Sequence, residues 1–203
     1  MKRILILNGS IQGSCGNSHR FLLKFVDEIK KLNTETHFNL LSCSEITENP
    51  KLSREQKLLQ ISELFENHDA FVFATGTYWD SWGSPMQAWL ELMTPLEGTS
   101  AILGKPVSVL VTMHSVGGKE VLSRLQGVLS TMGFLVPPMA HMAYSLQNHL
   151  LASSVAKTCD FAEDFWNLSD LEIMAHNLLQ ALSQKARYRS WEVDRKDPQR
   201  IWF

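Results

Sequence analysis

The chain lacks the features of an extracellular, metal-binding or membrane-spanning protein. Its 203 residues include only three cysteines, at positions 15, 43 and 159, and these form neither a disulfide framework nor a close-spaced set of metal ligands. No apolar run approaches membrane-spanning length, and the run after Lys2 and Arg3 ends at Asn8, too early for a signal peptide. We therefore expect a cytoplasmic protein with no bound metal.

A strong charge of one sign is also missing. The 19 Lys and Arg residues nearly balance the 21 Asp and Glu residues, so the net charge is −2. Surfaces that bind nucleic acids or anionic membranes are usually basic, and we expect neither partner here. With no internal repeat or low-complexity segment, the length favours a single domain over residues 1–186. The remaining tail, residues 187–203, mixes arginines with tryptophans and is expected to dock on this domain or on a sister subunit.

The stretch from Ile4 to His19 is the most informative part of the chain. An unbroken apolar run, typical of a buried parallel strand, is followed by a loop of Gly, Ser and Asn without acidic residues. An amphipathic helix follows, with Asn17 or Ser18 as its expected N-cap. A strand, a small polar loop and a helix N-terminus together direct free backbone N–H groups at one point, an arrangement that suits a phosphate.

Other loops that follow a strand fit this stretch less well. A P-loop needs Gly-Lys-Ser/Thr, but no lysine lies between the strand and Lys24. The glycines at 9, 13 and 16 do not match the dinucleotide fingerprint, and Arg20 lies one position too close to Cys15 for a low-molecular-weight phosphatase loop. The acidic residues of a response regulator are missing. A turn whose small residues serve only chain reversal remains an alternative.

Strands and helices alternate along the rest of the chain. Helix boundaries are indicated by capping boxes at Ser53–Gln56 and Ser169–Glu172, by Pro85 in a first turn and by Gly133 after a last turn, and a weakly patterned helix is expected over 147–167. Further strands are expected at residues 36–41, 69–74, 107–111 and 134–136. This alternation predicts an α/β fold, a flavodoxin-like three-layer αβα sandwich with a five-stranded parallel sheet in the order 2-1-3-4-5.

Three loops should meet where the order of such a sheet reverses, beyond the carboxyl ends of its strands. They are residues 8–18, 75–83 and 114–118. The first offers an anion cradle, the second an aromatic surface for a flat ring, and the third a glycine-rich backbone that can approach closely. A phosphate at one end and a planar ring at the other describe a mononucleotide, for which flavin mononucleotide (FMN) is the natural candidate.

At these loops the chain resembles the NAD(P)H-dependent FMN reductase-like flavoproteins, which have a flavodoxin-like fold. The resemblance runs through residues 5–22 (Asn-Gly-Ser…Gly-Asn-Ser), 71–91 (Thr-Gly-Thr-Tyr-Trp-Asp-Ser) and 105–133. It implies that the FMN phosphate binds at Ser10, Gly16, Asn17 and Ser18. It implies that the isoalloxazine ring lies near Thr77, Tyr78, Trp79, Asp80 and Ser81, with further contacts from Ser115, Val116, Gly117 and Gly118.

The resemblance also implies NADPH or NADH as co-substrate, a small electron acceptor (quinone, azo compound, metal or flavin) and a homodimer or homotetramer. The chain departs from relatives at Gly76, where they usually have proline, and at Gln87, where they often have lysine. Two alternatives stay open: a flavodoxin-type FMN electron carrier, which the small net charge disfavours, and a flavin-free binding protein that keeps the fold. No catalytic acid or base is assigned, and Cys15, His19 and His114 flank the expected site without an assigned role.

Overall fold

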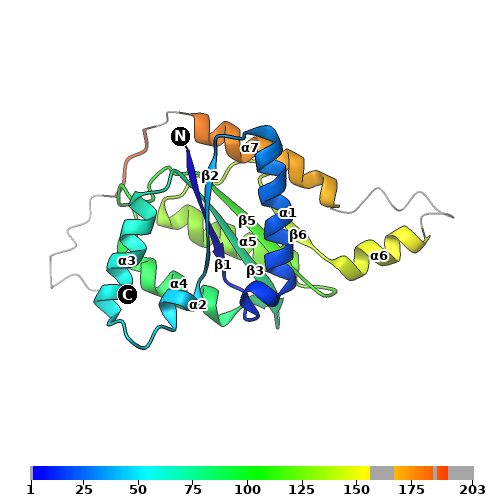
Figure 1. The fold of residues 1–203 in the computed structure, drawn as a ribbon, viewed down its shortest axis with the longest axis horizontal. Coiled ribbons are helices and arrows are strands. Elements are labelled where there is room, and N and C mark those ends of the chain that lie inside the picture. The colour runs from blue at the N-terminus through cyan, green and yellow to red at the C-terminus, as the bar shows by residue number, and fades with distance from the viewer. Residues whose placement is uncertain (1, 156–166, 185–186, 192–203) are drawn as a thin grey trace.

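A parallel sheet of five strands forms the centre of the computed structural model, which describes residues 2–155, 167–184 and 187–191 (Figure 1). The strands in spatial order are β2 (His37–Ser42), β1 (Arg3–Asn8), β3 (Ala70–Tyr78), β5 (Val107–Thr112) and β6 (His141–Tyr144). Because β5 and β6 are the fourth and fifth parallel strands, the predicted order 2-1-3-4-5 is confirmed. A short sixth strand, β4 (Ser81–Trp82), pairs antiparallel with the end of β3 and was not predicted.

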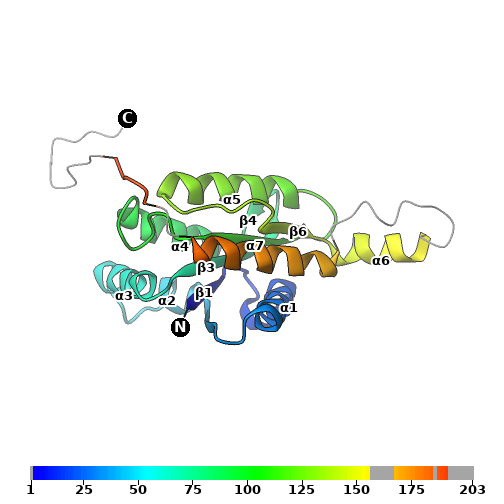
Figure 2. The same cartoon turned by 90° about the horizontal axis from the view of Figure 1, so that it is seen from above.

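Helices cover both faces of the sheet, so the predicted three-layer sandwich is confirmed (Figure 2). Alternate residues of β1 face opposite layers: Ile4 and Ile6 pack with α1 (Asn17–Leu32) and α7 (Leu171–Ser183). Leu5 and Leu7 belong to the other core, with residues of the helices on that face. Those helices are α2 (Ser44–Thr47), α3 (Arg54–Glu66), α4 (Ser84–Met93, followed by the 3-10 turn Thr94–Leu96) and α5 (Gly118–Met132).

Most of the predicted helix boundaries are confirmed. At the start of α3 the Gln56 N–H donates to Ser53 Oγ (3.2 Å), and the Ser53 N–H donates to Gln56 Oε1 (2.8 Å). Pro85 lies in the first turn of α4, and Gly133 ends α5 with a left-handed φ of 113°. The second capping box was misplaced: it joins Asn167 to Asp170 in a 3-10 turn ahead of α7.

The prediction of a strand at residues 134–136 is wrong. Leu135 forms only an isolated bridge with Pro106, and the edge strand is β6, which begins at His141. Pro137 and Pro138, which lack the N–H groups of a strand ladder, separate the two segments. The chain therefore joins the sheet only after these prolines.

The segment after β6 is helical, as predicted, over α6 (Leu146–Val155), which projects away from the sheet in both views (Figures 1 and 2). The rest of that predicted helix up to residue 166, Cys159 and tail residues 192–203 lie outside the described residues. The described tail residues reach the N-terminal end of β5. A side chain on Gly104 (φ 75°) would overlap the Tyr188 ring, so the tail packs closely against this glycine.

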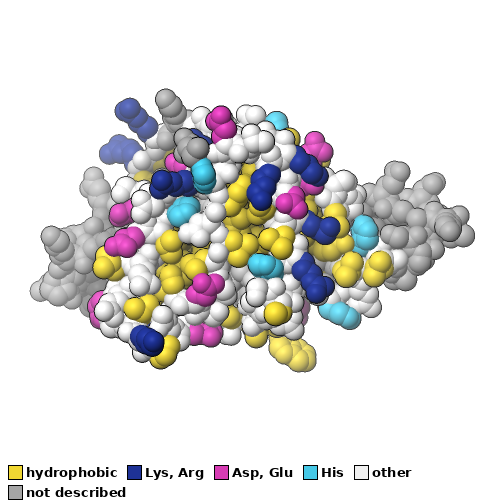
Figure 3. Space-filling view, in the orientation of Figure 1, with side chains coloured by type: hydrophobic (Ala, Val, Ile, Leu, Met, Phe, Trp, Pro, Cys, Tyr) yellow, Lys and Arg dark blue, Asp and Glu magenta, His cyan; other side chains and the backbone are white. Residues whose placement is uncertain are grey.

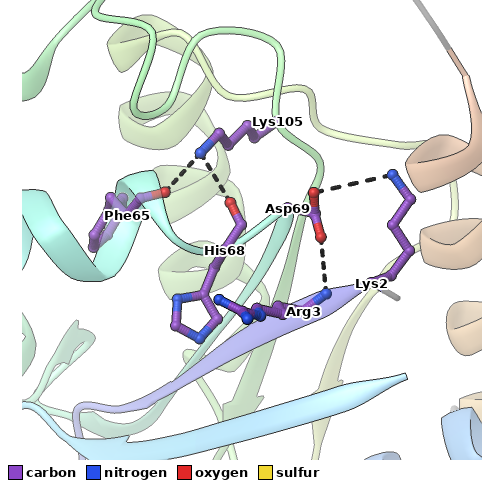
Figure 4. Close-up of polar contacts among 6 residues, drawn as sticks. All are labelled: Lys2, Arg3, Phe65, His68, Asp69 and Lys105. Atoms are coloured by element: carbon purple, nitrogen blue, oxygen red, sulfur yellow. Dashed lines mark hydrogen bonds and ion pairs between the residues drawn. The ribbon is translucent and has the colours of Figure 1, made fainter. Parts of the chain in front are cut away.

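Charged and polar contacts fasten the N-terminal ends of the strands (Figure 4). Lys105 Nζ donates to the carbonyl oxygens of Phe65 (2.6 Å) and His68 (2.8 Å), just where α3 ends. Burial lowers the pKa of the Lys105 ammonium group, while the nearby carboxylate of Asp69 opposes this shift. Asp69 also accepts from the Arg3 N–H (2.8 Å), so β1 and the start of β3 are joined at this end.

Hydrophobic side chains gather near the middle of the face shown in Figure 3, over the region where β2 lies in Figure 1. Phe38 and Leu40 of this edge strand are half-buried and pack against the core beneath α1. Lys30 places its Nζ 5.9 Å from the centre of the Phe38 ring, a cation–π distance. A charged side chain thereby shields part of the sheet edge, which protects it against pairing with another strand.

The side chain of His141 completes the hydrogen bonding at the opposite edge of the sheet. Its Nδ1 accepts from the Val109 N–H (3.1 Å), and its Nε2 lies 3.0 Å from the Pro137 carbonyl oxygen. The ring is therefore neutral, with its proton on Nε2. Burial lowers the pKa of His141 from 6.5 to about 4.

Because the folded pKa of His141 lies below the unfolded one, its contribution to stability is present above pH 6.5 and is lost as the pH falls toward 4. The difference corresponds to about 3 kcal/mol of unfolding free energy. In His141→Asn, whose amide oxygen can accept from Val109 but does not titrate, we expect a smaller loss of stability over this range, measured by urea unfolding at several pH values. The matched change at exposed His176, His176→Asn, should keep the wild-type slope, and an equally steep slope in His141→Asn would contradict the assignment.

Candidate functional site

The first site element is the start of α1. Its N-cap is Gly16 instead of the predicted Asn17 or Ser18, and no side chain caps the first turn. The first four N–H groups of a helix have no partner within it, and here there is no acidic residue in the first turn to accept from them. This end of α1 therefore presents uncompensated backbone donors and the positive end of the helix dipole.

Asn8 organises the loop that leads to this helix. The side chain is 1% exposed; its Nδ2 donates to the Gly13 carbonyl oxygen (2.9 Å) and its Oδ1 accepts from the Ser10 N–H (3.2 Å). Gly13 begins the 3-10 turn Gly13–Cys15 with a positive φ of 53°. Asn8 thus positions the loop between β1 and α1. In the sequence this residue is part of the Asn-Gly-Ser motif, but no role was predicted for it.

Ser18 connects the start of α1 to the centre of the sheet. Its Oγ lies 2.7 Å from Oγ1 of Thr112, the last residue of β5. Ser18 is buried, and each of the two hydroxyl groups has an acceptor lone pair or a proton left for a further partner. The end of the first predicted loop is therefore joined to the end of β5 by a hydrogen bond at the carboxyl end of the sheet.

The second loop is a β-hairpin instead of an irregular loop. Tyr78 of β3 pairs with Ser81 of β4, and the two residues between them, Trp79 and Asp80, have φ of 50° and 57°. Two successive positive φ values are typical of the tight turns that suit the twist of a hairpin. Trp79 is 99% exposed at its tip. The hairpin is fixed from outside by Arg124, whose Nη1 donates to the Asp80 carbonyl oxygen (3.2 Å) and whose guanidinium lies 5.0 Å from the Trp82 ring centre.

The third loop contacts this hairpin directly. Gly117 precedes α5 with a φ of 84°, and a Cβ atom at this position would overlap the Asp80 carboxylate. The other side of the loop is fastened to the start of α6: Ser145 Oγ donates to the His114 carbonyl oxygen (2.7 Å), and Asn148 Nδ2 donates to that of Ser115 (3.2 Å). All three predicted loops therefore meet at one end of the sheet.

A cavity of about 340 Å³ opens between these loops. Of the predicted site residues, Ser10, Gly16, Asn17, Ser18, Thr77 and Tyr78 line it. The others, Trp79, Asp80, Ser81, Ser115, Val116, Gly117 and Gly118, lie in the hairpin and the third loop without lining this cavity. Gln12 and Gly76 of the predicted loops and His114, which had been noted beside the site, line it too. The remaining lining residues are Phe21, Thr112, Met113, Tyr144 and Leu146.

The chemistry of the lining fits a phosphorylated flavin. None of the described residues around the cavity is Asp, Glu, Lys or Arg, so the donors are hydroxyl, amide and backbone N–H groups. Two buried polar atoms of the lining, Thr77 Oγ1 and Tyr144 Oη, have no hydrogen-bond partner among the described residues. A ligand with oxygen and nitrogen atoms would supply such partners, and the volume is within the range of small-molecule sites.

A larger cavity, of about 620 Å³, lies beside β6 and shares Met113 with the first. It is lined mainly by methionines, by residues of β6 and by the start of α7, and no residue of the loops after β1 or β3 contributes to it. It therefore lacks the uncapped start of α1, and the start of α7 that lines it brings the carboxylate of Asp170. We place the candidate cofactor site in the smaller cavity.

The described residues have neither a metal-binding cluster nor a membrane-spanning helix. They contain no group of three or more His, Cys, Asp or Glu side chains that could hold a metal ion. Within these ranges no helix is both long and apolar enough to cross a membrane. Cys15 is exposed near the cavity, whereas Cys43 is buried, and burial raises the pKa of its thiol.

The strand order defines a flavodoxin-like fold, and the cavity is its candidate site for a phosphorylated ligand. The model of the NADPH-dependent FMN reductase family matches residues 2–149, which is most of the chain. This chain therefore belongs to the NADPH-dependent FMN reductase family, and its cofactor is FMN.

Solved structures share the fold at low sequence identity. An oxidoreductase from Corynebacterium diphtheriae is 15% identical, with a TM-score of 0.69, and the match covers 92% of this chain and 99% of that one. FerB, an NAD(P)H:acceptor oxidoreductase from Paracoccus denitrificans, is 20% identical (TM-score 0.61; coverage 89% and 99%). General stress protein 14 from Treponema denticola, solved in complex with FMN, is 16% identical (TM-score 0.53; coverage 90% and 98%). No curated protein gave a significant match.

The contact between the second and third loops can be tested at Gly117. We expect Gly117→Ala to lower the unfolding free energy by about 1–3 kcal/mol and to weaken FMN binding, because the new methyl group meets Asp80 and the residue must keep a left-handed φ. The matched control is Gly127→Ala in α5, where an added Cβ meets nothing within 4 Å. This control should raise stability by about 0.5–1 kcal/mol. Equal effects at both positions, measured by thermal or urea unfolding, would contradict the packing described.

Proposed function

We propose that this protein is an FMN-dependent oxidoreductase that takes electrons from NADPH or NADH and passes them to a small acceptor, such as a quinone, an azo compound, a metal or free flavin. The observation that carries the proposal is the uncharged donor cradle at the start of α1, set beside a rigid aromatic hairpin in a chain of the FMN reductase family. Bound FMN supplies the hydride chemistry at its ring N5.

The chain's own residues hold and orient this cofactor in the proposal. Ser10, Gly16, Asn17 and Ser18 would take the phosphate, since they line the cavity next to the free N–H groups of α1. The hairpin residues 77–81 and the third-loop residues 115–118 would flank the ring. Gly117 allows the two loops to approach, and Arg124 keeps the hairpin in place against α5.

The reaction needs no ionised side chain in the cavity. Of the described lining residues only His114, Tyr78 and Tyr144 can gain or lose a proton, so no catalytic acid or base is assigned. Exposed apolar side chains lie on the neighbouring loops, including Trp79, Val116 and Ile11. They offer a surface for a flat acceptor or for a sister subunit, and a homodimer or homotetramer is part of the proposal.

The cofactor can be tested with the full-length protein stripped of any flavin. We expect one FMN per chain to bind, with a change in the flavin absorbance bands and quenching of flavin fluorescence. Bovine serum albumin at the same concentration serves as the control for non-specific binding. Absence of any spectral change up to millimolar FMN would overturn the proposed function.

The acceptor class can be tested with the FMN-loaded protein. We expect NADPH or NADH to bleach the bound flavin, and steady oxidation of the nicotinamide to begin when a small quinone is added without any protein partner. Loaded protein without quinone, and quinone without protein, provide the baselines. If the flavin is not bleached by either nicotinamide, the protein would be an electron carrier of the flavodoxin kind.

A further inference from the structure

Tyr144 ends the edge strand β6 at the same end of the sheet as the three loops. It pairs with Thr112 of β5, whose hydroxyl group is bonded to Ser18 at the start of α1. The Tyr144 ring is stacked on the Phe21 ring of α1, with 5.1 Å between their centres and 22° between their planes. The tyrosine therefore lies on the α1 side of the cavity, away from the hairpin.

The hydroxyl group of Tyr144 is buried without a partner among the residues that the structure describes. The residue is 7% exposed and lines the cavity, and no described residue forms a hydrogen bond with its Oη. Buried polar groups are nearly always paired, so an unpaired one needs an explanation. Five other described residues also have a buried side-chain nitrogen or oxygen atom without a hydrogen-bond partner. Of these five, only Thr77 lines this cavity.

We propose that Tyr144 is a specificity-determining residue of this site: its hydroxyl group donates a hydrogen bond to the phosphate of bound FMN. The inference rests on the proposed FMN site and adds a residue from outside the three loops. Its position beside Phe21 and Thr112 places it near the first turn of α1, where the phosphate is expected, whereas Thr77 lies at the hairpin end.

The charge state of the phenol agrees with this role. Burial raises the pKa of Tyr144, so the group keeps its proton at neutral pH and can donate. Since no described Lys or Arg lines the cavity, the side-chain donors available to the phosphate are hydroxyl and amide groups and the His114 imidazole. Each such donor then accounts for a substantial share of the selection of FMN over riboflavin, which lacks the phosphate.

The test compares Tyr144→Phe with the wild type in the flavin-free full-length protein. A hydrogen bond from a neutral donor to a charged group is lost, so we expect the Kd for FMN to rise about 10- to 100-fold. The Kd for riboflavin should change less than about threefold, because riboflavin does not reach this donor. The flavin-free variant should melt at the wild-type temperature or up to about 4 °C higher, since an unpaired buried hydroxyl group has been removed.

Tyr188→Phe is the matched control, because Tyr188 packs on Gly104 at the far end of the sheet. It should leave the affinities for both flavins unchanged. The inference is overturned if Tyr144→Phe binds FMN as tightly as the wild type, if it weakens riboflavin to the same degree, or if the flavin-free variant melts at a lower temperature. If the wild-type protein does not bind FMN, that result would instead overturn the proposed function.

Discussion

The site depends on the unpaired N–H groups at the start of α1. A helix usually satisfies one of these donors with an N-cap side chain, but Gly16 has none. Asn8, a residue type that often caps helices, uses both ends of its carboxamide inside the loop instead. The donors are thereby kept for an anion, and the dipole of a sixteen-residue helix adds to their effect.

The centre of the sheet and the loops after β1, β3 and β5 followed from the sequence, because strands buried on both faces appear as continuous apolar runs. The loops that follow them carried the glycines, serines and aromatic residues from which a phosphate and a flat ring were predicted. The opposite edge was less predictable. Two prolines interrupt the apolar run there. The strand was therefore expected before Pro137, whereas β6 lies after Pro138. Tyr144 was missed for this reason: its place beside Thr112 is visible only when β6 is in register.

The hairpin shows a second limit of sequence reasoning. Tight turns with positive φ usually carry Asn-Gly or Asp-Gly, whereas this one carries Trp79 and Asp80. A bulky residue in a left-handed conformation is uncommon and stores strain of about 1–3 kcal/mol. Contacts distant in sequence offset this strain. Arg124 of α5 donates a hydrogen bond to the Asp80 carbonyl oxygen, and Gly117, which has no Cβ, leaves room for the Asp80 side chain. These contacts are tertiary, so no local pattern announces them.

The two ends of the sheet carry different contacts. At the N-terminal end, Lys105 donates to carbonyl groups in and just after the last turn of α3, Asp69 joins two strands, and the tail packs against Gly104. At the carboxyl end, Thr77 Oγ1 and Tyr144 Oη of the cavity wall have no partner among the described residues, and α1 begins without a side-chain cap. Unpaired groups reduce the stability of the flavin-free fold, and Thr36 and Ser108 near the N-terminal end also have buried hydroxyl oxygens without a partner among the described residues. In the proposed complex, FMN would pair with the groups at the carboxyl end and stabilise the folded state through the same atoms that recognise it, which would couple FMN affinity to the stability of the protein.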